Sequence, residues 1–200
     1  MRIYLIRHAQ TEGNALKRYI GVTDSPLSKD GIAMAQAAGG DSELKSVIVT
    51  PLSRTQHTAR ILFPNAEQRI ESGITEMDFG DFENRSADDM ANDADYRAWV
   101  DGNCLGRCPN GESIAGFSER VTRAFWQCVR RAENEGEERL VFVVHGGVIM
   151  ALMSVLGRPK KSFYDWYLPN CACVQADTAK DAETGEEYLD NVIIKENVSL

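Results

Sequence analysis

The stretch MRIYLIRHAQTEGN (residues 1–14) decides the fold of this chain of 200 residues. Its apolar part, IYLI (residues 3–6), is short, continuous and rich in β-branched and aromatic residues, a pattern typical of a parallel strand that is buried on both faces. The run ends on Arg7 and His8, two side chains that are costly to bury, and small and polar residues follow. We therefore predict a core strand whose carboxyl end presents Arg7 and His8.

Two other runs show the same continuous apolar pattern, VIV (residues 47–49) and LVFVV (residues 140–144). Segments with apolar residues at helical spacing lie between these runs and after them. Strands that alternate with helices predict an α/β fold, here a three-layer sandwich with a largely parallel central sheet flanked by helices. One helix is predicted between the cap Ser28 and Gly39, a second between the cap Ser53 and Pro64, and a third from the cap Ser113 through Ala132. A last helix is predicted over 148–156, before Gly157.

The C-terminal residues show two strand-like runs, 173–176 and 188–194, on either side of the turn-rich sequence ETGE (residues 183–186). These runs predict a hairpin at the edge of the sheet. Residues 78–101 stand apart, because they contain eight acidic and two basic residues together with four aromatic ones. We expect an acidic excursion at about 78–112 that lies over one end of the sheet, within a single domain that covers residues 1–200.

The net charge of −8 argues against a nucleic-acid-binding or membrane-binding protein, because both partners require a basic surface. An anion-binding site in this chain therefore has to be a local cluster of positive charge within a protein of negative net charge. The five cysteines are odd in number and scattered, so we expect no disulfide framework. Arg7 and His8 interrupt the apolar run near the start, which is unlike a signal peptide, and a cytoplasmic location is the expectation.

Polar residues gather where the predicted strands end, and ligands of open α/β sheets bind beyond the carboxyl ends of the strands. The first strand ends on Arg7 and His8, the second leads to Arg54, and the third ends on His145. A single histidine at a strand end is usually a structural residue, but two of them with arginines on matched strands favour a common site. Guanidiniums bind phosphate oxygens and a neutral imidazole can attack phosphorus. His57, three residues beyond Arg54, is expected to be peripheral.

These residues belong to a series of motifs that resembles the histidine phosphatase superfamily, which includes the cofactor-dependent phosphoglycerate mutases. The resemblance covers about residues 1–157, and an ordered series of motifs is far more specific than any one of them. The motifs are RHAQTEGN (7–14), GVTDSPLSKDG (21–31), SRTQHTA (53–59), EMDFGDFE (76–83), GES (111–113) and HGG (145–147).

The resemblance implies a catalytic role for three residues. His8 would be the nucleophile that forms a phosphohistidine, with a backbone carbonyl fixing its tautomer and Arg7 disfavouring its protonation. Glu76 would protonate the leaving oxygen and then activate water, and His145 would help to hold the transferring phosphoryl group. No metal ion and no cofactor is implied, since arginines neutralise the phosphoryl oxygens. The phosphate-binding residues would be Arg7, Asn14 and Arg54.

The acidic motif leaves two candidates for the proton donor, Glu76 and Glu83. Glu76 is favoured because its position in the motif matches the acid of the family. Glu83 is the rival, or else a residue that orients Arg54 without being the acid. Thr11 and Gly146 are further residues that we expect to support the site or to contact the substrate.

The acidic excursion bears on the substrate. Mutases of this family are typically longer and need extra cationic groups for the carboxylate of their substrate. An acidic excursion instead favours a small-molecule phosphomonoester whose other end is neutral, cationic or aromatic. The sequence FGDFE (79–83) is similar to that of α-ribazole phosphatases, which makes that activity the leading specific hypothesis. A phosphoglycerate mutase and a non-catalytic domain that binds a phospho-ligand or a partner stay as alternatives, and a homodimer is a possible assembly. The candidate rings for stacking on substrate, or for packing the excursion, are Phe79, Phe82, Tyr96 and Trp99.

Overall fold

In residues 1–198 and 200, which the computed structural model describes, the strand of the opening stretch is a central member of a six-stranded sheet. The strand order is β3-β2-β4-β1-β5-β6, in which the first four strands are parallel and β5 and β6 form an antiparallel hairpin next to β1. The predicted α/β fold, with its largely parallel sheet and C-terminal edge hairpin, is confirmed. The strands are β1 (Arg2–Arg7), β2 (Ser46–Val49), β3 (Glu67–Ile70), β4 (Arg139–Val144), β5 (Cys173–Lys180) and β6 (Glu187–Lys195).

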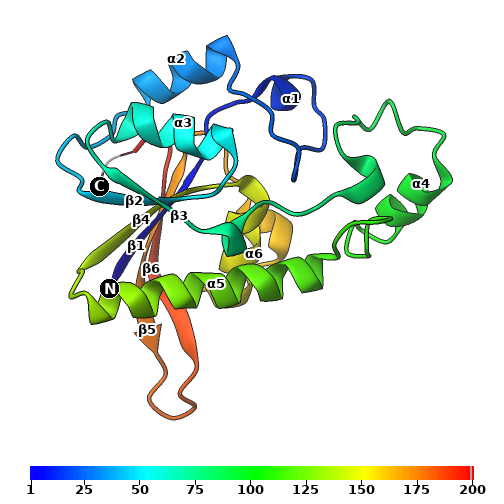
Figure 1. The fold of residues 1–200 in the computed structure, drawn as a ribbon. Helices are drawn as coiled ribbons and strands as arrows, with labels where there is room; N and C mark the ends of the chain where they lie inside the picture. Colours follow the sequence, from blue (N-terminus) through cyan, green and yellow to red (C-terminus); the bar gives the residue numbers. More distant parts are fainter. Residues whose placement is uncertain (199) are drawn as a thin grey trace.

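Helices cover both faces of the sheet, with α2 and α3 on one face and α5 and α6 on the other (Figure 1). The side chains of β1 enter both layers of core: Ile3 and Leu5 pack with residues of α5 and α6, whereas Tyr4 and Ile6 pack with residues of α2 and α3. Successive residues of a strand point to opposite faces, so a strand covered on both faces is continuously apolar. The helices are α1 (Glu12–Ala15), α2 (Lys29–Ala37), α3 (Ser53–Leu62), α4 (Ala94–Asp101), α5 (Ile114–Asn134) and α6 (Gly146–Leu156), with the 3₁₀ helices η1 (Ser72–Ile74), η2 (Gly80–Phe82) and η3 (Phe163–Trp166).

Two of the three predicted caps are confirmed. The side chains of Ser28 and Ser113 each accept a hydrogen bond from the N–H three residues further on, over 2.9 and 3.3 Å. The prediction that Ser53 caps α3 is wrong, because Ser53 is the first helical residue and the carboxylate of Asp24 accepts from its N–H and its hydroxyl. The last predicted helix, α6, begins two residues earlier than expected, directly after His145.

The elements that the sequence did not predict include β3 and α4. The sequence of β3, EQRI, is polar, and this strand lies at the edge of the sheet, where its side chains are half-buried or exposed. In the excursion, α4 follows Asp93, whose carboxylate accepts from the N–H groups of Asp95 and Tyr96. Figure 1 shows α4 beyond the end of the sheet where α6 begins.

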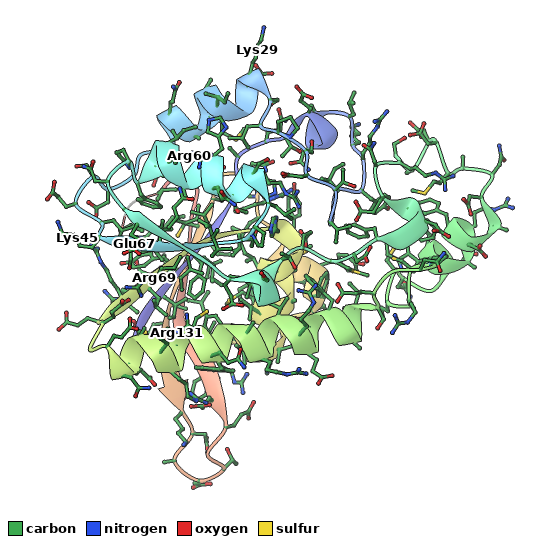
Figure 2. The ribbon with its side chains drawn as sticks, in the orientation of Figure 1. Lys29, Lys45, Arg60, Glu67, Arg69 and Arg131 are labelled. Atoms are coloured by element: carbon green, nitrogen blue, oxygen red, sulfur yellow. The ribbon has the colours of Figure 1, made fainter. Side chains whose placement is uncertain are left out.

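The described helices include none that is long and apolar enough to cross a membrane. The labelled side chains of Lys45, Glu67, Arg69 and Arg131 lie on the side of the molecule away from α4, around β3 and α5 (Figure 2), where Arg69 forms ion pairs with Glu135 and Glu137. They are remote from the carboxyl ends of β1 and β4, so positive charge at those ends has to come from other residues.

Candidate active site

The parallel pairing of β1 and β4 brings the two strand-end histidines together. Arg7 is opposite Val144 in the register, so His8 and His145 each directly follow the last paired residue of their strand. The centroids of the two imidazole rings are 5.3 Å apart. The chain leaves β1 toward α2 on one face and leaves β4 into α6 on the other, and such diverging connections open a crevice between two strand ends.

His8 is buried, with 4% of its surface exposed, and one of its ring nitrogens has a fixed partner. Its Nδ1 lies 2.7 Å from the carbonyl oxygen of Ala9, which can only accept, so Nδ1 has the proton and Nε2 has the free lone pair. Burial, followed by the charge of Arg54 and then that of Arg7, lowers the pKa of His8 well below its ordinary value of 6.5. Arg7 acts in the predicted direction, but burial is the larger cause.

Arg54 is 1% exposed and orients the second histidine. Its Nε donates to Nδ1 of His145 over 3.2 Å, so Nε2 of that ring has the proton and donates to the hydroxyl of Thr50 over 3.0 Å. Burial and the charge of Arg54 lower the pKa of His145 well below 6.5. The terminal nitrogens of Arg54 donate to the carbonyls of Gly21 (2.6 Å) and Thr23 (2.8 Å). A phosphoryl contact at Nδ1 of His145 would first require Arg54 to release that nitrogen.

Arg7 has a buried donor without a partner. Its Nη1 donates to the carbonyl of Leu168 over 2.5 Å, and its guanidinium lies over the ring of Tyr167. Its Nε is buried and has no hydrogen-bond partner among the described residues. An unpaired buried donor costs about 1–3 kcal/mol, and a phosphate oxygen would satisfy it. A Cβ at Gly146 would lie 3.1 Å from this Nε, so the missing side chain leaves room for Arg7 beside α6.

Glu76 is buried against the first turn of α6. Its Oε2 accepts from the N–H of Gly147 over 2.9 Å, and its Oε1 accepts from the N–H of Met77 over 3.0 Å. Burial raises the pKa of Glu76 and outweighs these two hydrogen bonds and the charge of Arg54, which lower it. A buried carboxyl group with a raised pKa is suited to donate a proton to a leaving oxygen. Gly147 was not predicted as a site residue, although it belongs to the HGG motif.

Asn14 and Thr11 form the capping box of α1. The hydroxyl of Thr11 accepts from the N–H of Asn14 over 3.1 Å, and Oδ1 of Asn14 accepts from the N–H of Thr11 over 3.2 Å. Because Oδ1 is occupied, the Nδ2 amide is the group that Asn14 offers to the pocket that it lines. Thr11 is fully buried, so it supports Asn14 rather than contacting a ligand.

A pocket of about 270 Å³ has Arg7, Asn14, Glu76 and Gly146 in its wall and extends toward the excursion. The buried residues His8, Arg54 and His145 are not among the residues that line it. The remaining wall is mostly apolar and aromatic. Lining residues that the sequence did not indicate include several from the loop after α1, from α6 and from η3 and its flank, among them Arg18, Tyr19, Ile20, Met150, Phe163, Tyr164 and Tyr167.

The aromatic candidates of the excursion divide into two pairs. Phe79 and Trp99 line the pocket, whereas Phe82 and Tyr96 do not and are buried in the core, where their rings meet edge to face. Glu83 does not line the pocket either, and both its carboxylate oxygens accept hydrogen bonds from the backbone of residues 21–23.

Comparison with known proteins identifies the family of this chain. The sequence model of the histidine phosphatase superfamily (branch 1) matches residues 3–191. Probable phosphoglycerate mutase GpmB of Enterobacter sp. (strain 638) is 31% identical over 185 residues, which cover 88% of this chain and 85% of that protein. The crystal structure of the alpha-ribazole phosphatase from Shigella flexneri is similar over 100% of this chain and 99% of its own, with 28% identity and a TM-score of 0.80. That of a phosphoglycerate mutase from Thermus thermophilus is similar over the full length of both chains, with 25% identity and a TM-score of 0.70.

Proposed function

This chain belongs to the histidine phosphatase superfamily (branch 1) and is a histidine-dependent phosphatase, and we propose that it hydrolyses a small phosphomonoester through a phosphohistidine at His8, without a metal ion. The observation that supports this proposal best is the state of His8. The ring is buried, its Nδ1 is held by the carbonyl of Ala9 so that Nε2 has the free lone pair, and burial together with the charges of Arg54 and Arg7 lowers its pKa well below 6.5.

The proposed reaction has two displacements at phosphorus. In the first, the Nε2 lone pair of His8 forms the N–P bond while the bond from phosphorus to the ester oxygen breaks, and the proton of Glu76 goes to that oxygen. In the second, the Glu76 carboxylate takes a proton from water as the water oxygen attacks phosphorus, and the N–P bond breaks to release phosphate. Arg7 and Arg54 stabilise the charge on the equatorial oxygens in both steps.

For the substrate we propose α-ribazole phosphate or a similar nucleoside-like ester. Support comes from the wall of the pocket, where Phe79, Trp99, Tyr164 and Tyr167 offer rings to a flat leaving group. The similarity to the alpha-ribazole phosphatase from Shigella flexneri over nearly the full length of both chains supports the same substrate class.

A phosphoglycerate mutase is the second candidate, and one observation favours it besides the GpmB relative. Arg18 lines the pocket and donates to Oδ1 of Asn84 over 3.2 Å, so a second cation in addition to Arg7 is available for a substrate carboxylate. A non-catalytic phospho-ligand domain is disfavoured, since His8, Arg54 and Glu76 are all in place.

Rapid quench with a labelled aryl phosphate tests the chemistry. We expect label on the peptide that contains His8, in a bond that is labile to acid and stable to alkali, and we expect turnover to persist in the presence of a chelator. The His8→Ala variant should lose both the label and turnover. Label on serine, aspartate or cysteine, or activity that a chelator abolishes and a metal restores, would contradict the mechanism.

A substrate panel tests the specificity. We expect a higher kcat/KM for α-ribazole phosphate than for 3-phosphoglycerate, and an Arg18→Ala variant should change the former little. A higher kcat/KM for 3-phosphoglycerate that falls sharply in Arg18→Ala would instead support the mutase.

A further inference from the structure

The carboxylate of Glu83 occupies a concave stretch of backbone rather than the pocket. Its Oε1 accepts from the N–H groups of Gly21, Val22 and Phe79 over 3.0–3.1 Å, and its Oε2 accepts from the N–H groups of Gly21 and Thr23 over 3.2 Å. The hydroxyl of Thr23 donates to Oε2 over 2.5 Å. In each of these hydrogen bonds Glu83 is the acceptor, and five of the six come from backbone N–H groups, so the carboxylate is held by the loop and by Phe79.

The same loop holds Arg54 by its carbonyl oxygens. The N–H groups of Gly21 and Thr23 are bound to Glu83, while the C=O groups of these two residues accept from the terminal nitrogens of Arg54. Glu83 therefore binds the backbone N–H groups of the loop, and Arg54 binds the backbone carbonyl groups of the same loop.

Close packing fixes this loop against the acidic motif. A Cβ at Gly21 would lie 1.9 Å from the carbonyl oxygen of Met77 and 2.3 Å from Oε1 of Glu83, so the backbone could not approach so closely with any side chain there. The neighbouring segments also pair by backbone: the N–H of Tyr19 donates to the carbonyl of Arg85 over 3.0 Å. The position of the Arg54 acceptors therefore depends on the segment that holds Glu83.

We propose that Glu83 is a positioning residue for Arg54. It fixes residues 21–23 so that their carbonyls hold the guanidinium in the orientation that binds the phosphoryl group and His145. This inference rests on the proposed function, because it assigns to Arg54 the binding of phosphate. It also assigns the two glutamates of the acidic motif different tasks, since Glu76 lines the pocket and Glu83 does not.

A double-mutant cycle tests this role. Glu83→Gln places an amide N–H₂ among backbone donors, and we expect kcat/KM for an aryl phosphate to fall on the order of tenfold to a hundredfold, as for linked residues of one hydrogen-bond network. In an Arg54→Lys background Glu83→Gln should lower kcat/KM about twofold or less, because lysine lacks the guanidinium that Glu83 positions. The dissociation constant of inorganic phosphate, measured by calorimetry, should follow the same pattern.

Two further variants separate positioning from stability. Thr23→Val removes one donor to Glu83 and should give a smaller loss that is again suppressed in Arg54→Lys. Asp181→Asn is the matched control, since Asp181 also accepts backbone N–H groups, those of Glu183 and Thr184, but lies in the turn between β5 and β6, away from the loop of residues 21–23. It should lower the melting temperature without changing kcat/KM.

The outcomes distinguish this inference from the proposed function. Equal losses from Glu83→Gln in both backgrounds, for turnover and for phosphate binding, would overturn the positioning role and leave the phosphatase intact. A wild-type protein that binds phosphate but does not hydrolyse esters would overturn the proposed function. The double-mutant cycle measured by the dissociation constant of phosphate would then decide the role of Glu83. A wild-type protein that does not bind phosphate would overturn both.

Discussion

Replacing Gly147 by alanine should displace the carboxyl group of Glu76, the proposed proton donor, without disturbing the fold. The added Cβ would lie 2.3 Å from Oε1 of Glu76 and 3.0 Å from its Cδ, whereas ordinary contacts begin at 3.4 Å. The carboxyl group would have to move by about 1 Å, and a displacement of this size can cost about 10²-fold in rate. Gly147 is in the first turn of α6, where alanine is the better helix former by about 0.5–1 kcal/mol, so the helix itself should not be weakened.

Leaving-group dependence is the assay for this displacement. We expect kcat of Gly147→Ala to fall about 10²-fold for an alkyl phosphate and much less for an activated aryl phosphate, whose leaving group needs little protonation. Gly146→Ala is the matched control, because its Cβ would lie 3.1 Å from Nε of Arg7 and should slow both substrates alike. Equal losses for both substrates in Gly147→Ala, or no loss at all, would refute the placement of Glu76 as the acid.

The buried groups of the site lead to three further predictions. Arg54→Ala should lower kcat by about 10²–10³-fold, the effect of losing one preorganised donor, and Arg54→Lys should restore only part of it; near-normal kcat in Arg54→Ala would remove this residue from the site. Glu76→Gln should slow alkyl esters far more than aryl esters, and Glu83→Gln should slow both equally; the reverse pattern in steady-state kinetics would make Glu83 the acid. Because burial lowers the pKa of His8 and His145 below 6.5, the unfolded chain binds more protons than the folded chain just below that pH. The free energy of unfolding should therefore fall as the pH drops from 7 to 5, by up to about 1.4 kcal/mol per pH unit for each histidine. Glu76, whose pKa is raised, contributes to the pH dependence of the unfolding free energy with the opposite sign. Urea titrations at several pH values should therefore compare the parent with His8→Asn, in which the dependence of the unfolding free energy on pH should be smaller by the contribution of one histidine. An unchanged pH dependence would contradict the lowered pKa of His8.

The sequence determined the elements whose signal is local. The continuous apolar run of β1 predicted a strand covered on both faces, and Ser28 and Ser113 marked helix starts by side-chain chemistry that acts over three residues. β3 had no such signal, because an edge strand does not need apolar residues. The strand-end positions of His8 and His145 predicted a shared site, since parallel strands bring their carboxyl ends to one edge of the sheet.

The tertiary structure alone decided which backbone groups the two glutamates contact. Glu76 is held by the N–H of Gly147, which is 71 positions away in the chain, and Glu83 by the N–H groups of residues about 60 positions away. Every residue except proline has the same backbone N–H and C=O, so no sequence pattern marks which of them a carboxylate or a guanidinium will meet. The sequence therefore determined which side chains are available for phosphoryl chemistry. The long-range packing of backbone around them decided which carboxyl group faces the pocket and which one lies behind the loop that holds Arg54.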